Sequence, residues 1–497
     1  MQRRRPSRAH SREPILRAAL RRVPRAAWLC VAIAFINAAA WSLILPPFQG
    51  RDEIDHFAYT QQLAEKGSLP HAPQTPPGYS THEGLVLEGL HYWQSRFSSY
   101  VPAISSVAEQ RALMADVDTS QPQQLSGEAG GAWSAPPLYY ALQTIPYAMG
   151  AGNVLVQLQL MRLFSALLGA ITALLVFFFL REILPAVPWA ATLGALCVAL
   201  QPQFAFMAGS VNPDVMLYAL SAGVFLCLAR SFRRGVSRPT MIALGALVAA
   251  GLVTYFSFIG VAVGALAALV VLAARELKAG NRAALASLGM GAGIAVAPAV
   301  LYGLRNLVVG HPLFGFVSGQ GGGGGSILEK VSYAWQLYLP RLPGMTHYFP
   351  GLSTPSIWFD RSVGLYGWMD VTFPSWVDSV ALVAAAAVLA LCCRELVLRR
   401  GSLLRRLPEL ASYGAIALGV LLIIAAASFK SDAIEHSGAF GEPRYLLPLL
   451  PLLGAVVVLA VRGAGRRWMP VVGAAIVILF LGHDLFSQFQ AIGRYYG

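Results

Sequence analysis

The sequence predicts an all-α protein that crosses a membrane many times. Of its 497 residues, 56% are hydrophobic and only 12% are charged. Several uninterrupted apolar runs approach the roughly 20 residues that a helix needs to cross a bilayer. The net charge of +13 arises from arginines in loops beside these runs. This placement is typical of orientation signals rather than of a nucleic-acid-binding surface, so we expect no nucleic-acid partner.

Eleven apolar runs predict about eleven membrane-spanning helices. An N-terminus in the cytoplasm places 25 of the 37 basic residues on the cytoplasmic side, as the positive-inside bias requires. The segment NAAAW at 37–41 faintly resembles a signal-peptide cleavage site, but the apolar run continues past it, so we expect an uncleaved anchor. The expected spans are residues 27–46, 159–180, 188–208, 212–229, 240–257, 258–274, 283–303, 377–393, 410–428, 445–461 and 468–483.

The segment APPLYYALQTIPYAMG at 135–150 tests this arrangement, because one more span here would invert everything after it. It is short and interrupted by Pro146, so we expect an interfacial or re-entrant helix on the outer face. The two large outer loops should each carry such short helices. The expected segments are a basic cytoplasmic tail (1–26), a transmembrane domain (27–487) with outer loops at 47–158, 304–376 and 429–444, and an outer C-terminal tail (488–497).

A cluster of acidic residues follows the first apolar run, in the segment PPFQGRDEIDHF at 46–57. Asp52, Glu53 and Asp55 are close enough that repulsion and desolvation would raise the pKa of at least one of them, unless a cation lies nearby. Such a group could act as a general base toward a sugar hydroxyl. The structural alternative is that these acids cap a short helix starting near Asp52 and oppose its macrodipole. The two roles are compatible.

Further polar segments are expected at the same level of the membrane. Their arginines could bind a phosphate and their aromatic faces a sugar ring. The ordinary alternatives are a turn and helix cap for the NPD segment, an interfacial belt for the tryptophans, and snorkelling for a lone arginine. These segments are SVNPD (210–214), Arg305 with Asn306, LYGWMDVTFPSW (365–376) and EHSGAFGEPRYLLP (435–448).

Several of these segments together resemble a known family. The segments PPFQGRDEIDHF, APPLYY, NPD, YGWMD and PRYLLPLLPLL occur in the order of the signature segments of a domain-of-unknown-function family of bacterial multi-spanning proteins, which is similar to the GT-C glycosyltransferases. The resemblance runs from about residue 27 to 487. Two departures stand out: Arg51 takes the place of an expected proline, and Glu442 with Pro443 replaces a shorter glycine lead-in.

The resemblance implies a GT-C-like fold in the bacterial inner (cytoplasmic) membrane, with an active site facing the periplasm or cell exterior. It implies transfer of a sugar from a polyprenyl-phosphate carrier to an acceptor glycan, glycolipid or protein, and direct displacement from that carrier would invert the anomeric centre. By position, Asp52 and Glu53 match the catalytic acids, although Arg51 could lower the pKa of Asp52. The candidate substrate-binding residues are Asp55, His56, Tyr139, Asn212, Asp214, Arg305, Trp368, Asp370, Arg444 and Tyr445.

We expect no cofactor and no metal. A divalent metal is the alternative, because Asp52, Glu53 and Asp214 offer hard oxygen ligands, but no motif fixes their geometry. Two other functions are weighed. A polysaccharide ligase or polymerase would need the same base and phosphate-binding groups. A transporter or flippase of lipid-linked glycans would place ionisable residues deep within spans, whereas the acids here fall at span ends.

Overall fold

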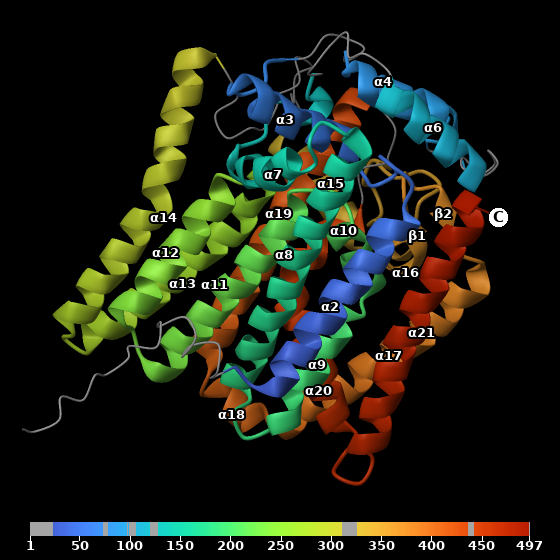
Figure 1. Ribbon diagram of the computed structural model, residues 1–497. Helices are drawn as coiled ribbons and strands as arrows, with labels where there is room; N and C mark the ends of the chain where they lie inside the picture. Colours follow the sequence, from blue (N-terminus) through green and yellow to red (C-terminus); the bar gives the residue numbers. More distant parts are fainter. Residues whose placement is uncertain are drawn as a thin grey trace, which may run out of the picture.

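Long helices run side by side between the two ends of the molecule, and short helices cover one end (Figure 1). This computed structural model describes residues 23–72, 78–96, 98, 106–119, 128–310, 326–435 and 442–496. Most of the N-terminal tail and most of the glycine run at 318–326 lie outside the described residues. We call the end covered by short helices the outer end, and the opposite end the inner end.

Nine segments of the described chain are long and apolar enough to cross a membrane. With the bent pair α9–α10 and the shorter apolar helix α12 (Arg238–Leu252), the chain passes between the two ends as often as the eleven predicted spans require. The all-α, membrane-spanning fold class is therefore confirmed. The nine segments are α2 (Arg25–Ile44), α8 (Val154–Ile183), α11 (Asp214–Arg234), η2 with α13 (Phe256–Phe258 and Ile259–Lys278), α14 (Arg282–Val309), α17 (Ser375–Leu398), α19 (Leu407–Glu435), η4 with α20 (Pro443–Leu449 and Leu450–Gly463) and α21 (Met469–Tyr496).

One expected straight span is bent. Residues 188–208 form α9 (Pro188–Ala199) and α10 (Pro202–Ala208), which meet at 65°. Pro202 lacks the backbone N–H that would continue α9, and the side chain of Gln201 accepts a hydrogen bond from the backbone N–H of Phe204 and so caps α10. The bend turns α10 toward α2 and α8 beneath the short helices of the outer end.

The first outer loop forms most of the covering layer. Its helix α7 spans 12 residues and is too short to cross a membrane, as expected for the 135–150 segment. Tyr140 on α7 stacks on Tyr59 of α3, with ring centroids 3.7 Å apart, and this contact fixes the two helices against each other. The elements are α3 (Glu53–Lys66), α4 (Thr81–Gly89), α5 (Tyr92–Ser95), α6 (Val107–Thr119), η1 (Gly130–Ala132) and α7 (Leu138–Met149).

The second outer loop ends in a small hairpin. Strand β1 pairs antiparallel with β2, with Leu365 opposite Thr372. The tight turn between them requires Gly367, whose φ is +62°, because a Cβ there would lie 2.3 Å from a carboxylate oxygen of Asp370. The elements of this loop are α15 (Ile327–Tyr338), the π-helix η3 (Ser356–Asp360), α16 (Arg361–Gly364), β1 (Leu365–Tyr366) and β2 (Val371–Thr372); α18 (Arg400–Leu404) lies at the inner end.

The last helix differs from the expectation. Helix α21 continues to Tyr496, so residues 488–496 extend the final span instead of forming a separate tail. Asp484 therefore lies within this helix rather than beyond it. Its carboxylate accepts hydrogen bonds from Trp41 on α2 (3.2 Å) and from Gln488 (3.2 Å). An acidic residue inside a span is thus present, and its partners tie α21 to α2.

Candidate active site

The turn between α2 and α3 separates two adjacent acids. Asp52 has a left-handed backbone, with φ of 57° and ψ of 15°, and its side chain is 35% exposed. Glu53 begins α3 and is 0% exposed. Asp52 makes no capping hydrogen bond to α3, so the helix-cap role considered for it is wrong. A left-handed conformation is uncommon for residues other than glycine, and it turns the side chain of Asp52 away from that of Glu53.

Glu53 is enclosed by donors. Arg162 of α8 donates from Nε to Oε1 (2.9 Å) and from Nη2 to Oε2 (2.6 Å). The backbone N–H groups of Val211 and Gly50 donate to the same carboxylate at 2.9 and 3.3 Å. Glu53 therefore joins the first outer turn to α8 and to the turn before α11. The catalytic role expected for Glu53 does not fit this geometry, because a buried carboxylate held by four donors has no access to a substrate hydroxyl.

Asp52 instead faces two arginines. Arg444 of η4 donates from Nη2 to Oδ2 at 2.9 Å, and Nε of Arg51 lies 4.0 Å from the same oxygen. Partial burial alone raises the pKa of Asp52, but Arg444 and then Arg51 outweigh it and lower this pKa from 3.8 to about 2. Asp52 is thus ionised at neutral pH, and it is the exposed member of the acid pair.

A second carboxylate bridges the same two arginines. Glu442 accepts from Nη2 of Arg51 (2.5 Å) and lies 2.7 Å from Nε of Arg444. Arg51 and Glu442 are the two departures from the family pattern noted in the sequence, and the structure shows that they form an ion pair with each other. We call Arg51, Asp52, Glu442 and Arg444 the charged cluster.

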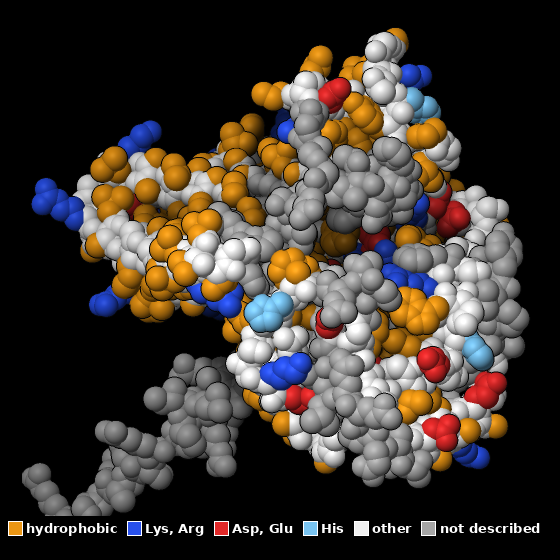
Figure 2. Space-filling model, turned by 90° about the horizontal axis from the view of Figure 1, so that it is seen from above, with side chains coloured by type: hydrophobic (Ala, Val, Ile, Leu, Met, Phe, Trp, Pro, Cys, Tyr) orange, Lys and Arg blue, Asp and Glu red, His pale blue; other side chains and the backbone are white. Residues whose placement is uncertain are grey.

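A small cavity adjoins the charged cluster. It measures about 20 Å³ and is bordered by Arg51, Glu442 and Arg444 on one side and by Phe206, Met207 and Gly367 on another. A space of this size holds about one water molecule. Seen from the outer end, acidic and basic side chains gather in a recess near the middle of the face (Figure 2).

The NPD turn lies directly against this cluster. Asn212 donates from Nδ2 to the backbone carbonyl of Arg51 (3.1 Å) and accepts from the backbone N–H of Asp214 (2.9 Å). Asp214, the first residue of α11, is 4% exposed and interacts electrostatically with Arg444 and Asp52. Tyr445 accepts a hydrogen bond from Nη2 of Arg444 at 3.0 Å. The fold therefore brings Asn212, Asp214, Arg444 and Tyr445 together with Asp52, whereas the sequence placed them only at one membrane level.

Three other expected residues make hydrogen bonds within the covering layer or from it to α8. Asp55 accepts from the Tyr79 hydroxyl (2.8 Å) and from the backbone N–H of Gly131 (3.1 Å), and burial raises its pKa to about 6. His56 hydrogen-bonds the Tyr140 hydroxyl through Nδ1 (3.0 Å), and burial lowers its pKa to about 4. The Tyr139 hydroxyl hydrogen-bonds Ser165 and Gln143. These contacts hold α3 and α7 in place rather than lining the cavity.

Trp368 and Asp370 act on the cluster from the hairpin turn. The Trp368 ring contacts two guanidinium groups, with Arg51 at 4.9 Å and Arg96 at 3.9 Å from its centroid. Asp370 accepts from the backbone N–H of Trp368 (2.9 Å) and pairs with Arg494 (3.2 Å). Trp368 therefore contacts Arg51 of the charged cluster through its ring, and Asp370 fixes the backbone of Trp368. Neither was predicted in this supporting role.

Arg305 is not part of this arrangement. It is exposed near the outer end of α14 and donates to the side chain of Asn306. In the part of the chain that the structure describes, no contact joins it to Asp52 or Arg444. The outer half of α14 stands apart from the bundle (Figure 1).

Sequence reasoning missed Arg162 and Arg96. The signal for Arg162 was available, because a single arginine inside an otherwise uncharged span is costly and demands a buried partner. Arg96 carries no such signal, since it lies in a polar loop. Among the described residues, no group of three or more His, Cys, Asp or Glu side chains is arranged to hold a metal ion.

The fold and this site define a multi-pass, all-α membrane protein with a buried charged cluster at one end. Residues 35–453 match the family described as "Predicted membrane protein (DUF2142)", and the chain belongs to this family. This confirms the family that the sequence segments resemble. No curated protein matches the chain.

Two solved structures of one protein are similar in fold. ArnT from Cupriavidus metallidurans, bound to undecaprenyl phosphate, is 15% identical, with 95% of this chain and 75% of that chain covered at a TM-score of 0.46. The same protein in the apo state is also 15% identical, with 94% and 73% covered at a TM-score of 0.46. Likeness of this degree does not by itself transfer an activity.

Proposed function

We propose that this protein is a membrane glycosyltransferase. It would transfer a sugar from a polyprenyl-phosphate donor to an acceptor glycan, glycolipid or protein at the outer face of the bacterial inner membrane. The observation that carries this proposal is the pairing of an ionised, partly exposed Asp52 with Arg444 and Arg51 at the membrane edge. A carboxylate beside guanidinium groups can bind a hydroxyl and a phosphate at adjacent positions.

The proposed step is a direct displacement. The acceptor oxygen forms a bond to the anomeric carbon as the bond from that carbon to the phosphate oxygen breaks. The acceptor proton passes to Asp52, and the electron pair leaves with the polyprenyl phosphate, whose charge Arg444 would stabilise. Attack on the face opposite the leaving phosphate inverts the anomeric centre. No step requires an oxidant or reductant.

Arg444 would also control how basic Asp52 is. While Arg444 and Arg51 pair with it in the charged cluster, the pKa of Asp52 is about 2, which is low for a general base. A donor phosphate that accepts hydrogen bonds from Arg444 would draw this guanidinium away from Asp52 and raise its pKa. Asp52 would thus gain basicity when the donor is bound.

The donor phosphate would replace Glu442. Glu442 already occupies the guanidinium groups of Arg51 and Arg444, and the neighbouring cavity of about 20 Å³ admits no sugar. Three carboxyl groups, those of Asp52, Asp214 and Glu442, surround two guanidinium groups, so a further anion would be repelled unless one carboxylate withdraws. Donor binding is therefore expected to break the Arg51–Glu442 and Arg444–Glu442 pairs.

A transporter function is supported less well. Two buried ionisable residues within the described spans have partners that explain their presence, Arg162 with Glu53 and Asp484 with Trp41 and Gln488. A ligase or polymerase acting on lipid-linked glycans would share the same groups, and the size of the transferred glycan separates it from the proposed single-sugar transferase.

The direct test is an assay of the purified protein in lipid nanodiscs with a panel of polyprenyl-phosphate sugars. The proposal expects release of polyprenyl phosphate with one of these donors, and a product of inverted anomeric configuration. Transfer only from donors that carry whole glycans would replace the proposal with a ligase or polymerase. Movement of a lipid-linked glycan across the bilayer without release of the carrier phosphate would replace it with a transporter.

A further inference from the structure

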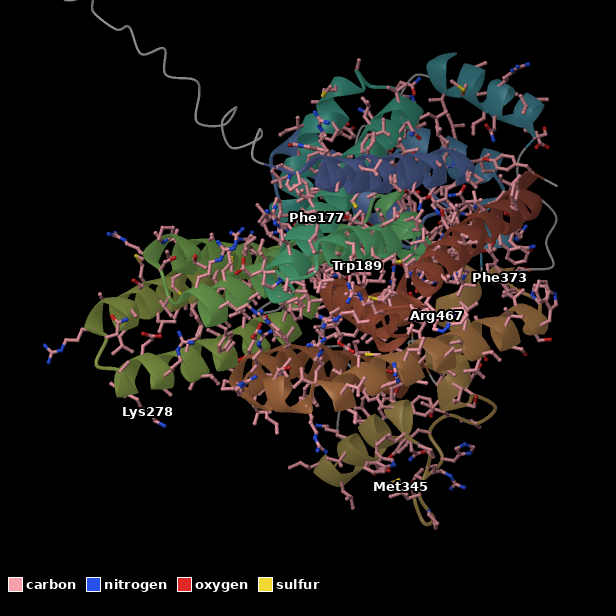
Figure 3. The ribbon with its side chains drawn as sticks, turned by 90° about the horizontal axis from the view of Figure 1, so that it is seen from below. Phe177, Trp189, Lys278, Met345, Phe373 and Arg467 are labelled. Atoms are coloured by element: carbon pink, nitrogen blue, oxygen red, sulfur yellow. The ribbon has the colours of Figure 1, made fainter. Side chains whose placement is uncertain are left out.

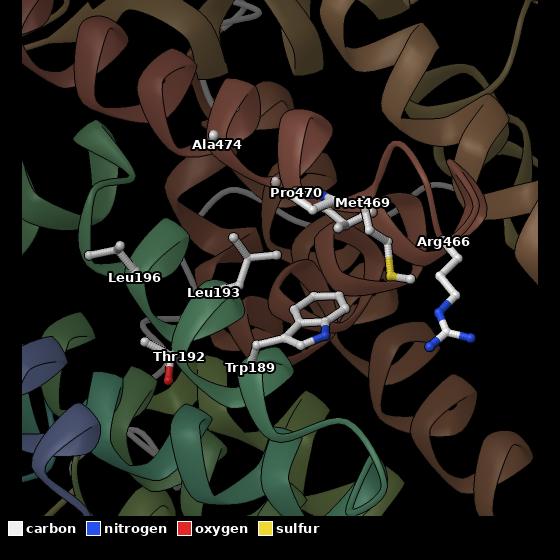
Figure 4. A pocket seen from close by; sticks show the side chains of 10 residues that line it. Trp189, Thr192, Leu193, Leu196, Arg466, Met469, Pro470 and Ala474 are labelled. Atoms are coloured by element: carbon white, nitrogen blue, oxygen red, sulfur yellow. The ribbon is translucent and has the colours of Figure 1, made fainter.

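A second cavity lies at the inner end, far from Asp52. A groove of about 500 Å³ opens between α9 and α21. Trp189, Leu193 and Leu196 line it from α9, where their spacing places them on one helix face, and Figure 4 shows them together with Met469 and Pro470 of α21. Arg466 lies at its edge, in the turn between α20 and α21. The groove is therefore apolar along its length and carries one positive charge at its rim.

Small residues keep the groove open. Gly473 and Ala474 of α21 line it opposite α9. A Cβ added at Gly473 would have its nearest neighbours at 3.6 Å, on Val461, and at 3.9 Å, on Leu193. There is ordinary van der Waals room for a side chain at this position, so the groove can be filled by substitution without moving the helices.

Among the described residues, no carboxylate pairs with the positive charge at the rim. The chain from 443 to 483 contains no acidic residue. Arg462 pairs with Glu395 at 3.1 Å, and Arg467 lies 5.8 Å from the Trp468 ring. Arg466 is exposed and takes part in none of the ion pairs found among the described residues. Figure 3, seen from below, shows Arg467 in the same turn and Lys278 at the tip of the α13–α14 hairpin.

We propose that this groove binds one anionic glycerophospholipid, with an acyl chain against α9 and α21 and the phosphate at Arg466. The distance along α9 from Trp189 to Leu196 is about 10 Å at 1.5 Å per residue, which matches the first part of an acyl chain below its headgroup. Trp189 sits near the rim, where tryptophan rings favour the membrane interface.

The charge decides which lipid is favoured. An arginine near a membrane surface favours an anionic over a zwitterionic headgroup by about fivefold. Apolar lining alone would hold either lipid, so the headgroup preference, rather than binding itself, is what Arg466 contributes. The polyprenyl carrier is a different occupant, and the outer end, not this groove, holds the site proposed for it.

The experiment measures lipid retention by native mass spectrometry of the full-length protein, with phosphatidylglycerol and phosphatidylcholine of identical acyl chains. The proposal expects one saturable phosphatidylglycerol per protein, preferred about fivefold. Arg466→Gln should abolish the preference while leaving phosphatidylcholine binding intact. Arg467→Gln, which removes a charge from the same turn but outside the groove, should leave the preference unchanged.

A second set of variants tests whether the lipid binds inside the groove, by filling it with a larger side chain. Gly473→Leu should abolish saturable binding of both lipids, and Ala474→Leu serves the same purpose if the first variant does not fold. An unchanged preference in Arg466→Gln would overturn the proposal, as would binding that does not saturate. Tighter retention of polyprenyl phosphate than of phosphatidylglycerol, lost in Arg466→Gln, would show that the groove holds the carrier instead. None of these outcomes depends on transferase activity.

Discussion

The two ends of the bundle use charge in different ways. At the inner end, two of the arginines that pair with acids are largely exposed to solvent: the side chain of Arg234 is 70% exposed beside Glu182, and that of Arg399 is 58% exposed beside Glu395. At the outer end, Arg162 is 3% and Arg444 is 7% exposed, and each holds a carboxylate. Exposed pairs contribute little to stability, whereas buried pairs cost desolvation, so the buried charges of the outer end call for a specific role.

The largest expected effect separates the two ends by stability. Arg162→Gln leaves Glu53 buried without its cation and should lower the free energy of unfolding by about 3–5 kcal/mol. Arg399→Gln removes an exposed partner at the inner end and should cost less than about 1 kcal/mol. Denaturant unfolding in the same detergent compares the two variants. Equal losses of unfolding free energy in the two variants would mean that the buried pair at the outer end matters no more for stability than the exposed pair at the inner end.

The next effect concerns the donor. Arg444→Lys retains the positive charge but cannot contact Asp52 and Glu442 at once, because an ammonium lacks the planar fork of a guanidinium. The KM for the donor should rise by about tenfold with little loss of folded protein. Arg305→Lys is the matched control, since Arg305 lies outside the cluster, and its donor KM should stay unchanged. A raised donor KM in Arg305→Lys together with an unchanged donor KM in Arg444→Lys would place the phosphate site at α14.

A smaller effect should follow from Glu442→Gln. Removing this carboxylate leaves Arg51 and Arg444 with a neutral neighbour, so the donor phosphate no longer competes with an anion. The donor KM should fall by about fivefold. Glu88→Gln, which neutralises an exposed acid on α4, should change nothing. A higher donor KM in Glu442→Gln would mean that Glu442 supports the binding site instead of occupying it.

The smallest effect is a pH dependence of stability. The pKa of Asp55 is raised to about 6 by burial, whereas an unfolded aspartate has a pKa of about 3.9. As pH rises from about 4 to 6, the unfolded chain loses this proton first, so this group makes the fold less stable across that window and has no further effect above it. Asp55→Asn should remove that decline. His56 acts with the opposite sign in both proteins, so the difference between their melting curves isolates Asp55, and identical curves would contradict the assignment.

The sequence predicted the membrane level of the candidate site better than it predicted the role of each residue there. The apolar runs determine the spans, and polar segments at span ends must lie at one membrane level, so the common level of Asp52, Asn212, Asp214 and Arg444 could be predicted, but their contact in the fold could not. The separate environments of Asp52 and Glu53 could not be predicted from the sequence, because they depend on the left-handed backbone of one residue in the turn, Asp52.

Long-range pairing explains the remaining differences. Arg51 and Glu442 are distant in sequence, and only the folded chain shows that they form an ion pair. The separation of Arg305 from the cluster follows from the way the outer half of α14 leaves the bundle, which hydropathy does not encode. The predicted last span ended at residue 483, before Asp484, because the apolar run ends there, whereas hydrogen bonds donated by Trp41 and Gln488 satisfy the Asp484 carboxylate inside the continuing helix.

Asp52→Asn distinguishes Asp52 from Glu53 as the proposed general base. Asp52→Asn keeps the shape of the side chain, and asparagine tolerates the left-handed backbone of this position as well as aspartate does. With the donor identified in the nanodisc assay, turnover at saturating donor and acceptor should fall by about a hundredfold or more, since general bases contribute on the order of 10² to 10⁴. The Glu88→Gln control should retain full turnover. Full turnover by Asp52→Asn would show that Asp52 is not the base and leave the charged cluster with a structural role.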